Sequence, residues 1–182
     1  MKHIELLMDE SGLDRALSRI SHQILERNPH FQHIGIVGLQ TRGVFLAKRI
    51  VDKINSMEKT SLTAGILDVT LYRDDYRNPF KQPKVQVTDI PFDINNKNIV
   101  LIDDVLFTGR TIRAALDALM DLGRPKTIQL GVLVDRGMRE LPIRADFMGK
   151  EITTLENQEV SLKVKEKDGE DSLCLVELDK VT

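Results

Sequence analysis

The stretch "NIVLIDDVLFTGRT", residues 98–111, contains the most informative change of pattern in the chain. An apolar run typical of a buried strand stops at two adjacent aspartates, Asp103 and Asp104. A turn of small residues follows, and a helical pattern then begins at Arg110. The sequence therefore predicts a buried strand over 98–103, with the acidic pair where backbone pairing stops, and a helix directly after the turn.

The segments on either side alternate between helix and strand patterns. Ser11 is the expected N-cap of the first helix, and Gly123 is the expected end of the helix that begins at Arg110. Two runs around a glycine in the tail, "VSLKVKE" and "SLCLVEL", predict a C-terminal β-hairpin. The alternation predicts an α/β fold, a central parallel sheet flanked by helices, which binds ligands at the carboxyl ends of its strands. The expected helices are 11–28 and 41–57, and the other expected strands are 33–40, 62–73 and 127–136.

Composition limits the classes of protein that the chain can represent. Its 182 residues fit a single domain over 1–182, and 41% hydrophobic with 30% charged residues is typical of a globular chain. No apolar run approaches the roughly 20 residues of a membrane span, and the N-terminus does not resemble a signal peptide, so we expect a cytoplasmic protein with no membrane partner. Cys174 is the only cysteine, which excludes an internal disulfide and a multi-cysteine zinc site.

The acidic pair and the turn together suggest one kind of ligand. Two adjacent carboxylates repel each other unless a cation or hydroxyl donors satisfy them, and a ribose or a Mg²⁺-bound sugar offers both. Amide groups at a helix start favour an anion, and Gly109 lets the backbone approach it closely. Taken alone, the acidic pair is more simply explained as part of a solvated loop, and the threonine before the helix as a helix cap. The two features together favour a site for a phosphorylated pentose.

These residues resemble a known family. "VLIDDVLFTGRT" is similar to the signature with which type I phosphoribosyltransferases bind 5-phosphoribosyl pyrophosphate. "TLYRDD", "TGRTIRAALDAL", "IQLGVLVDRG" and "RELPIRAD" resemble the bifunctional pyrimidine-operon attenuators with uracil phosphoribosyltransferase activity, over about residues 8–150. The resemblance implies a type I phosphoribosyltransferase fold with a small hood, formed by about 134–182 plus the N-terminus, and a flexible catalytic loop over about 72–96.

The resemblance also implies roles for individual residues. Asp103 and Asp104 would bind the ribose hydroxyls and would approach a metal ion through substrate or water. Tyr72, Arg73 and Asp74 would begin the catalytic loop, so that Arg73 joins the two aspartates as a catalytic residue. The other expected contacts to 5-phosphoribosyl pyrophosphate and UMP fall in four groups: the pyrophosphate loop, Thr41, Arg42 and Gly43; the phosphate turn, Thr108, Gly109, Arg110 and Thr111; Val105; and Val134 and Arg136 near the base.

The activity implied is conversion of uracil and 5-phosphoribosyl pyrophosphate to UMP and pyrophosphate, with Mg²⁺ as cofactor. One position bears on the base. Family members that use hypoxanthine or guanine have an aspartate before the Thr-Gly pair, and this chain has Phe107 there. A phenyl ring cannot share a proton with a purine nitrogen, so Phe107 favours a pyrimidine. A phosphoribosyltransferase for another base remains the alternative.

A second activity is implied, namely binding of pyrimidine-operon leader mRNA in response to uridine nucleotides. Two positions depart from the family pattern, Met138 and Glu151, and the second places a negative charge in the expected RNA surface. The alternatives are a solvated helix face at the basic positions, or an RNA-binding regulator whose nucleotide pocket is mainly sensory. The family also implies a homodimer or a higher homo-oligomer. The candidate RNA-binding residues are Ser18, Arg19, His22 and Arg27 on one helix, and Arg139, Arg144 and Lys150 further along.

Overall fold

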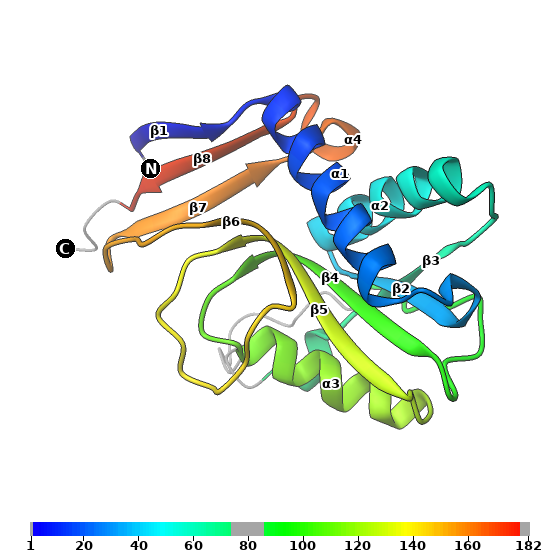
Figure 1. Cartoon of the computed structure of the whole chain (residues 1–182). Coiled ribbons are helices and arrows are strands. Elements are labelled where there is room, and N and C mark those ends of the chain that lie inside the picture. Colours follow the sequence, from blue (N-terminus) through cyan, green and yellow to red (C-terminus); the bar gives the residue numbers. More distant parts are fainter. Residues whose placement is uncertain (1, 74–85, 179–182) are drawn as a thin grey trace.

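The computed structural model describes residues 2–73 and 86–178. Within them, a central sheet has the strand order β3-β2-β4-β5-β6, and every neighbouring pair in it is parallel (Figure 1). The predicted α/β architecture is therefore confirmed. The strands are β2 (Ile34–Leu39), β3 (Ala64–Leu67), β4 (Asn98–Leu106), β5 (Thr127–Asp135) and β6 (Phe147–Glu151).

Helices cover both faces of this sheet because the strands are apolar on both sides. In β4, Val100 and Ile102 pack in the cluster that includes α1 (Glu10–Arg27) and α2 (Arg42–Glu58). Ile99 and Leu101 alternate with them and pack in the cluster that includes α3 (Arg110–Leu122). Side chains alternate between the faces of a strand, so each of these two clusters takes every second residue.

β4 is longer than the sequence predicted. We expected it to stop at Asp103, but it continues to Leu106 because β5 pairs with it throughout, up to Leu106 opposite Asp135. Asp103 itself lies opposite Val132. The two aspartates are therefore held inside a paired strand, which fixes their backbone more firmly than a strand end would.

Two local predictions were wrong. The N-cap of α1 is Asp9 rather than Ser11, because the Asp9 carboxylate accepts hydrogen bonds from the Gly12 amide at 2.7 Å and from the Ser11 hydroxyl at 2.9 Å. The strand expected over 62–73 covers only Ala64–Leu67. It ends because Asp68 Oδ1 accepts from the amide and the hydroxyl of Thr70, a local turn that competes with strand pairing.

A second, three-stranded sheet has the order β1-β8-β7 and is antiparallel. It contains β1 (Lys2–Met8), β7 (Gln158–Lys163) and β8 (Ser172–Glu177). The short helix α4 (Lys165–Asp168) lies in the connection between β7 and β8, so the predicted C-terminal hairpin is confirmed. We call this sheet together with α4 the hood (Figure 1). Within the described ranges, no helix has the length and hydropathy needed to cross a bilayer.

Candidate active site

A cavity of about 310 Å³ opens between the end of β4 and the start of α3. That volume lies at the lower end of the ~300–1,000 Å³ typical of small-molecule sites. Asp103 and the turn from Thr108 to Thr111 line this cavity together, whereas Asp104 is not part of its wall. Its wall consists of Arg73, Asp103, Val105, Leu106, Phe107, Thr108, Gly109, Arg110, Thr111, Ile112 and Glu140.

The turn before α3 is shaped by Gly109, which has a left-handed backbone (φ 92°) and forms the N-cap of the helix. The Thr108 hydroxyl accepts a hydrogen bond from the Arg110 amide at 3.3 Å. The Thr108 carbonyl accepts from the amides of Glu140 and Leu141 at 3.0 and 3.1 Å, which ties the turn to the loop after β5. The start of this 13-residue helix therefore lies at the cavity wall, with the positive end of the helix dipole.

The two aspartates have different environments. Asp103 is 7% exposed, and Asp104 is half-buried. Each carboxylate accepts one amide hydrogen bond at 2.9 Å, Asp103 from Asp104 and Asp104 from Val105. Burial, and then the neighbouring charge of Asp104, raise the pKa of the Asp103 carboxyl well above its usual range, while Arg73 acts in the opposite direction. A bound cation or a pair of hydroxyl donors would stabilise the charged form of the carboxylates against their mutual repulsion.

The loop before α2 packs directly against the end of β4. A methyl group added at Gly43 would lie 2.5 Å from the Ile102 carbonyl oxygen and 3.2 Å from the Asp103 Cα, and one added at Gly38 would lie 2.5 Å from the Gly43 carbonyl oxygen. Only glycine permits such approaches. The predicted pyrophosphate loop, Thr41 to Gly43, therefore lies beside Asp103, although these three residues are not part of the cavity wall.

The residues expected near the base are mostly buried. Val134 is fully buried between Val105 of β4 and Lys150 of β6, and it is not part of the cavity wall. Arg136 is 6% exposed. Its guanidinium donates to Thr154 Oγ1 at 3.2 Å and to the Gln158 carbonyl at 2.9 Å, and it lies over the Phe107 ring at 3.9 Å. Arg136 therefore links the hood to a residue of the cavity wall.

The structure places the candidate RNA-binding residues in two situations. Those of α1 come close to β6 and the chain before it: Arg19 donates to the Gly149 carbonyl, and Arg27 pairs with Asp146 at 3.0 Å. Arg139 instead lies under the loop after β5, where it donates to the carbonyls of Leu106, Phe107, Gly137 and Ile143 and to Asp135. These contacts give Arg139 a structural role. Ser18, His22, Arg144 and Lys150 are at least partly exposed.

Sequence reasoning missed several contacts that shape the site. Glu140 pairs with Arg110 at 2.5 Å, and Asp168 of the hood pairs with Arg42 at 3.1 Å. The acidic segment "KEKDGED" was visible in the sequence, but nothing in it indicated that it folds against α2. Asp74 and the rest of 74–85, about half of the expected catalytic loop, lie outside the described residues. Arg73 is described, and it lies in the cavity wall.

A parallel sheet whose central strand carries an acidic pair beside a phosphate-type turn defines a phosphoribosyltransferase. Residues 7–167 match the family model described as Phosphoribosyl transferase domain. Solved structures show the same fold. A hypoxanthine-guanine phosphoribosyltransferase of Bacillus anthracis has a TM-score of 0.71 at 17% identity, covering 97% of this chain and 99% of that one. The hypoxanthine phosphoribosyltransferase of Trypanosoma cruzi has a TM-score of 0.72 at 12% identity, covering 97% and 98%.

Curated relatives narrow the class. "Bifunctional protein PyrR" of Caldicellulosiruptor bescii is 53% identical over 180 residues, 99% of each chain. The protein of the same name from Clostridioides difficile is 52% identical over 171 residues, 94% of this chain and 97% of that one. The chain belongs to the phosphoribosyltransferases and, within them, to the family of bifunctional PyrR proteins.

Proposed function

We propose that this protein is a uracil phosphoribosyltransferase that also regulates pyrimidine genes through leader mRNA. Uracil N1 attacks the anomeric carbon of 5-phosphoribosyl pyrophosphate, the bond from that carbon to the diphosphate oxygen breaks, and the N1 proton is lost. The products are UMP and pyrophosphate. The observation that supports the proposal is the close approach of Gly43 to Asp103, because Asp103 lines the same cavity as the turn from Thr108 to Thr111.

Each part of the substrate has a proposed partner. The amides of 108–111 and the two threonine hydroxyls bind the 5-phosphate at the start of α3. Asp103 and Asp104 accept hydrogen bonds from the ribose hydroxyls, and the loop of Thr41, Arg42 and Gly43 binds the diphosphate. Positioning of this kind matters because the transition state has oxocarbenium character, and the aspartates stabilise positive charge on the sugar. Arg73 begins the catalytic loop that excludes water from the activated sugar.

The acidic pair also fits Mg²⁺, because carboxylate oxygens are ligands that this ion prefers. Within residues 2–73 and 86–178, no group of three or more His, Cys, Asp and Glu side chains forms a metal cage. We therefore propose that the ion is held mainly by substrate oxygens and water, with Asp103 and Asp104 nearby. When bound, Mg²⁺ neutralises charge on the leaving diphosphate.

The choice of base rests on Phe107, which forms part of the cavity wall. Its ring is apolar and offers no carboxylate to a purine nitrogen. Arg136 lies over the Phe107 ring and keeps it in place at the base end of the cavity.

An assay of base choice tests the enzymatic proposal. The purified protein is incubated with 5-phosphoribosyl pyrophosphate, Mg²⁺ and one labelled base at a time: uracil, cytosine, hypoxanthine or guanine. We expect UMP from uracil and little product from the purines. Asp104→Asn serves as the matched loss-of-function variant. Absence of uracil turnover in the wild-type protein would reject the proposal. Turnover of another base in its place would mean that the protein is a phosphoribosyltransferase for that base.

The regulatory half of the proposal rests on the contact between α1 and the chain around β6. Arg19 and Arg27, far from Arg144 and Lys150 in the sequence, reach Gly149 and Asp146 next to them. Basic side chains gathered on one surface can contact the phosphates of an RNA backbone, and the strength of such contacts depends on salt. Arg139 contributes to this surface by fixing the loop that leads to it.

Filter binding of the operon leader RNA tests this half over a series of salt concentrations, with and without UMP. Tighter binding with UMP and a clear salt dependence are expected. Binding that is indifferent to UMP would leave an enzyme without the proposed regulation.

We also propose that the protein forms a homodimer or a higher homo-oligomer. Leu71 is 72% exposed, and Met120 of α3 is 58% exposed. The residues that follow them in the chain, Tyr72 and Asp121, are joined by a hydrogen bond of 2.7 Å, so the two segments lie side by side. Exposed apolar side chains near one another favour association. Sedimentation velocity of the wild-type protein and of Met120→Glu is the test, and a monomer at all concentrations would refute the proposal.

A further inference from the structure

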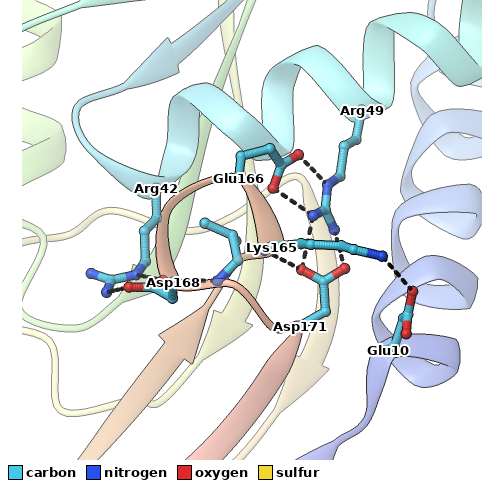
Figure 2. A network of polar contacts seen from close by, with 8 residues as sticks. Glu10, Arg42, Arg49, Lys165, Glu166, Asp168 and Asp171 are labelled. Atoms are coloured by element: carbon cyan, nitrogen blue, oxygen red, sulfur yellow. Dashed lines mark hydrogen bonds and ion pairs between the residues drawn. The ribbon is translucent and has the colours of Figure 1, made fainter.

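Two arginines of α2 attach the active-site side of the molecule to the hood. Arg42 and Arg49 are seven residues apart, close to two helical turns, so they lie on one face of α2. Both reach the turn between β7 and β8, residues 164–171, which we call the hood turn (Figure 2). Three carboxylates of the hood turn, those of Glu166, Asp168 and Asp171, receive them.

Arg49 forms the firm part of this attachment. Its guanidinium makes two hydrogen bonds to Glu166, at 2.8 and 2.6 Å, and two to Asp171, both at 2.8 Å (Figure 2). The Asp171 side chain is only 7% exposed and also accepts the Lys165 amide at 2.8 Å. A guanidinium shared by two bidentate carboxylates has little freedom, so the hood turn is held against α2.

Arg42 is held differently: only one carboxylate accepts its hydrogen bonds, and not all of its N–H groups are used. Its Nη2 lies 3.1 Å from Asp168 Oδ1, and its Nε lies 3.4 Å from Asp168 Oδ2. Asp168 is itself anchored, because its Oδ2 accepts the Val164 amide at 2.9 Å. The remaining nitrogen of Arg42, Nη1, makes no hydrogen bond within the described residues. The Arg42 side chain is 31% exposed, so it can reach a ligand.

We propose that Asp168 is a positioning residue, which orients Arg42 toward the diphosphate of the substrate, and that Arg49 holds the hood turn where Asp168 can do so. The inference rests on the proposed function, in which Arg42 contacts the diphosphate. Arginine has a long side chain with many rotamers, and a ligand that must order it binds more weakly. Asp168 restricts those rotamers before the substrate arrives and leaves Nη1 for the diphosphate.

Kinetics and binding of Asp168→Ala test the proposal. We expect KM for 5-phosphoribosyl pyrophosphate to rise roughly 3- to 10-fold, the scale of ordering one long side chain on binding. The dissociation constant for pyrophosphate, measured by calorimetry, is expected to rise in parallel, while KM for uracil stays near its wild-type value. The melting temperature is expected to fall by a few degrees, because the Val164 amide loses its acceptor. Glu170→Ala is the matched control, since Glu170 lies in the same turn but pairs with Lys163 at 2.6 Å.

A double-mutant cycle separates positioning from a general effect of charge. In an Arg42→Ala background, Asp168→Ala is expected to have no further effect on pyrophosphate binding, because Asp168 acts through Arg42. Independent, additive effects would overturn the proposal, and so would an unchanged or lowered KM in Asp168→Ala, which would mean that Asp168 restrains Arg42. Calorimetry with pyrophosphate needs no base, so the test stands even if uracil proves not to be the substrate.

Discussion

The guanidinium of Arg136 lies over the ring of Phe107, with 3.9 Å between its central carbon and the ring centroid. Arg136 is fixed by Thr154 and by the Gln158 carbonyl, so the hood determines where this wall of the cavity stands. Burial lowers the pKa of Arg136 from its usual range, but the group stays charged at any physiological pH. The base end of the proposed site thus depends on residues about 50 positions later in the chain.

Phe107→Leu tests this arrangement. The shorter side chain removes the ring from under Arg136 and enlarges the base end of the cavity, so KM for uracil is expected to rise several-fold while KM for 5-phosphoribosyl pyrophosphate stays unchanged. Loss of the cation–π contact costs about 0.5–2 kcal/mol of stability. Phe92→Leu is the control, because Phe92 also has a cation near its ring, Lys97 at 5.8 Å, but lies outside the cavity wall. Equal effects on uracil in both variants would contradict the prediction.

Asp103→Asn is expected to abolish most activity and to stabilise the protein. The loss of a charged acceptor for the ribose lowers kcat/KM roughly 10- to 100-fold. The gain in stability follows from the raised pKa of Asp103, since the folded protein must hold a buried carboxylate at neutral pH and the variant does not. Melting temperature should rise by about 2–4 °C for each kcal/mol gained. Asp52→Asn, at an exposed position of α2, is the control.

The same substitution makes a prediction about pH. Because the folded-state pKa of Asp103 is raised, the folded protein binds more protons than the unfolded chain between the two pKa values. Wild-type stability therefore falls as pH rises through that window, and the advantage of Asp103→Asn grows with it. Below the unfolded pKa, about 3.9, both proteins are neutral at this position and the difference should vanish. A difference in melting temperature that is constant from pH 4 to 8 would refute this cause.

Gly43→Ala should separate the pyrophosphate loop from the acidic strand. The added methyl group would lie 2.5 Å from the Ile102 carbonyl oxygen, so the loop or β4 must move. We expect a loss of about 1–3 kcal/mol in the free energy of unfolding and a marked rise in KM for 5-phosphoribosyl pyrophosphate. Gly65→Ala is the control, where the methyl group would meet only side-chain carbons, at 3.3 Å. Denaturant unfolding and initial-rate kinetics measure both effects.

Substitutions of Arg139 and Arg144, which both lie in the loop after β5, should affect different properties of the protein. Arg139→Gln leaves several carbonyls without a donor and is expected to cost about 1–3 kcal/mol of stability, with reduced uracil turnover, since one of those carbonyls belongs to Phe107. Arg144→Gln alters an exposed residue and is expected to weaken RNA binding and reduce the salt slope by about one, with stability and kinetics unchanged. RNA binding lost equally in both, with full stability, would contradict this division.

The sequence by itself determined the class of fold and the chemistry of the cavity. The alternation of apolar strands and amphipathic helices predicted the central parallel sheet, and "DDVLFTGRT" predicted an acidic pair next to a phosphate turn. These features were readable because they are local: strand, turn and helix start lie within 14 consecutive residues, 98–111. The extent of β4 was misjudged, since pairing with β5 carries it three residues beyond Asp103.

Only the tertiary structure decided which distant residues complete the site. Gly43 meets Ile102, Arg136 meets Phe107, and Asp168 meets Arg42 through contacts that no local pattern indicates. The strand β1 was missed for the same reason, as its partner β8 lies at the other end of the chain. The spacing of residues within a segment indicates which helix or strand that segment can form. Contacts between distant segments depend instead on how the helices and sheets pack together, and this packing is determined by the burial of side chains across the whole molecule.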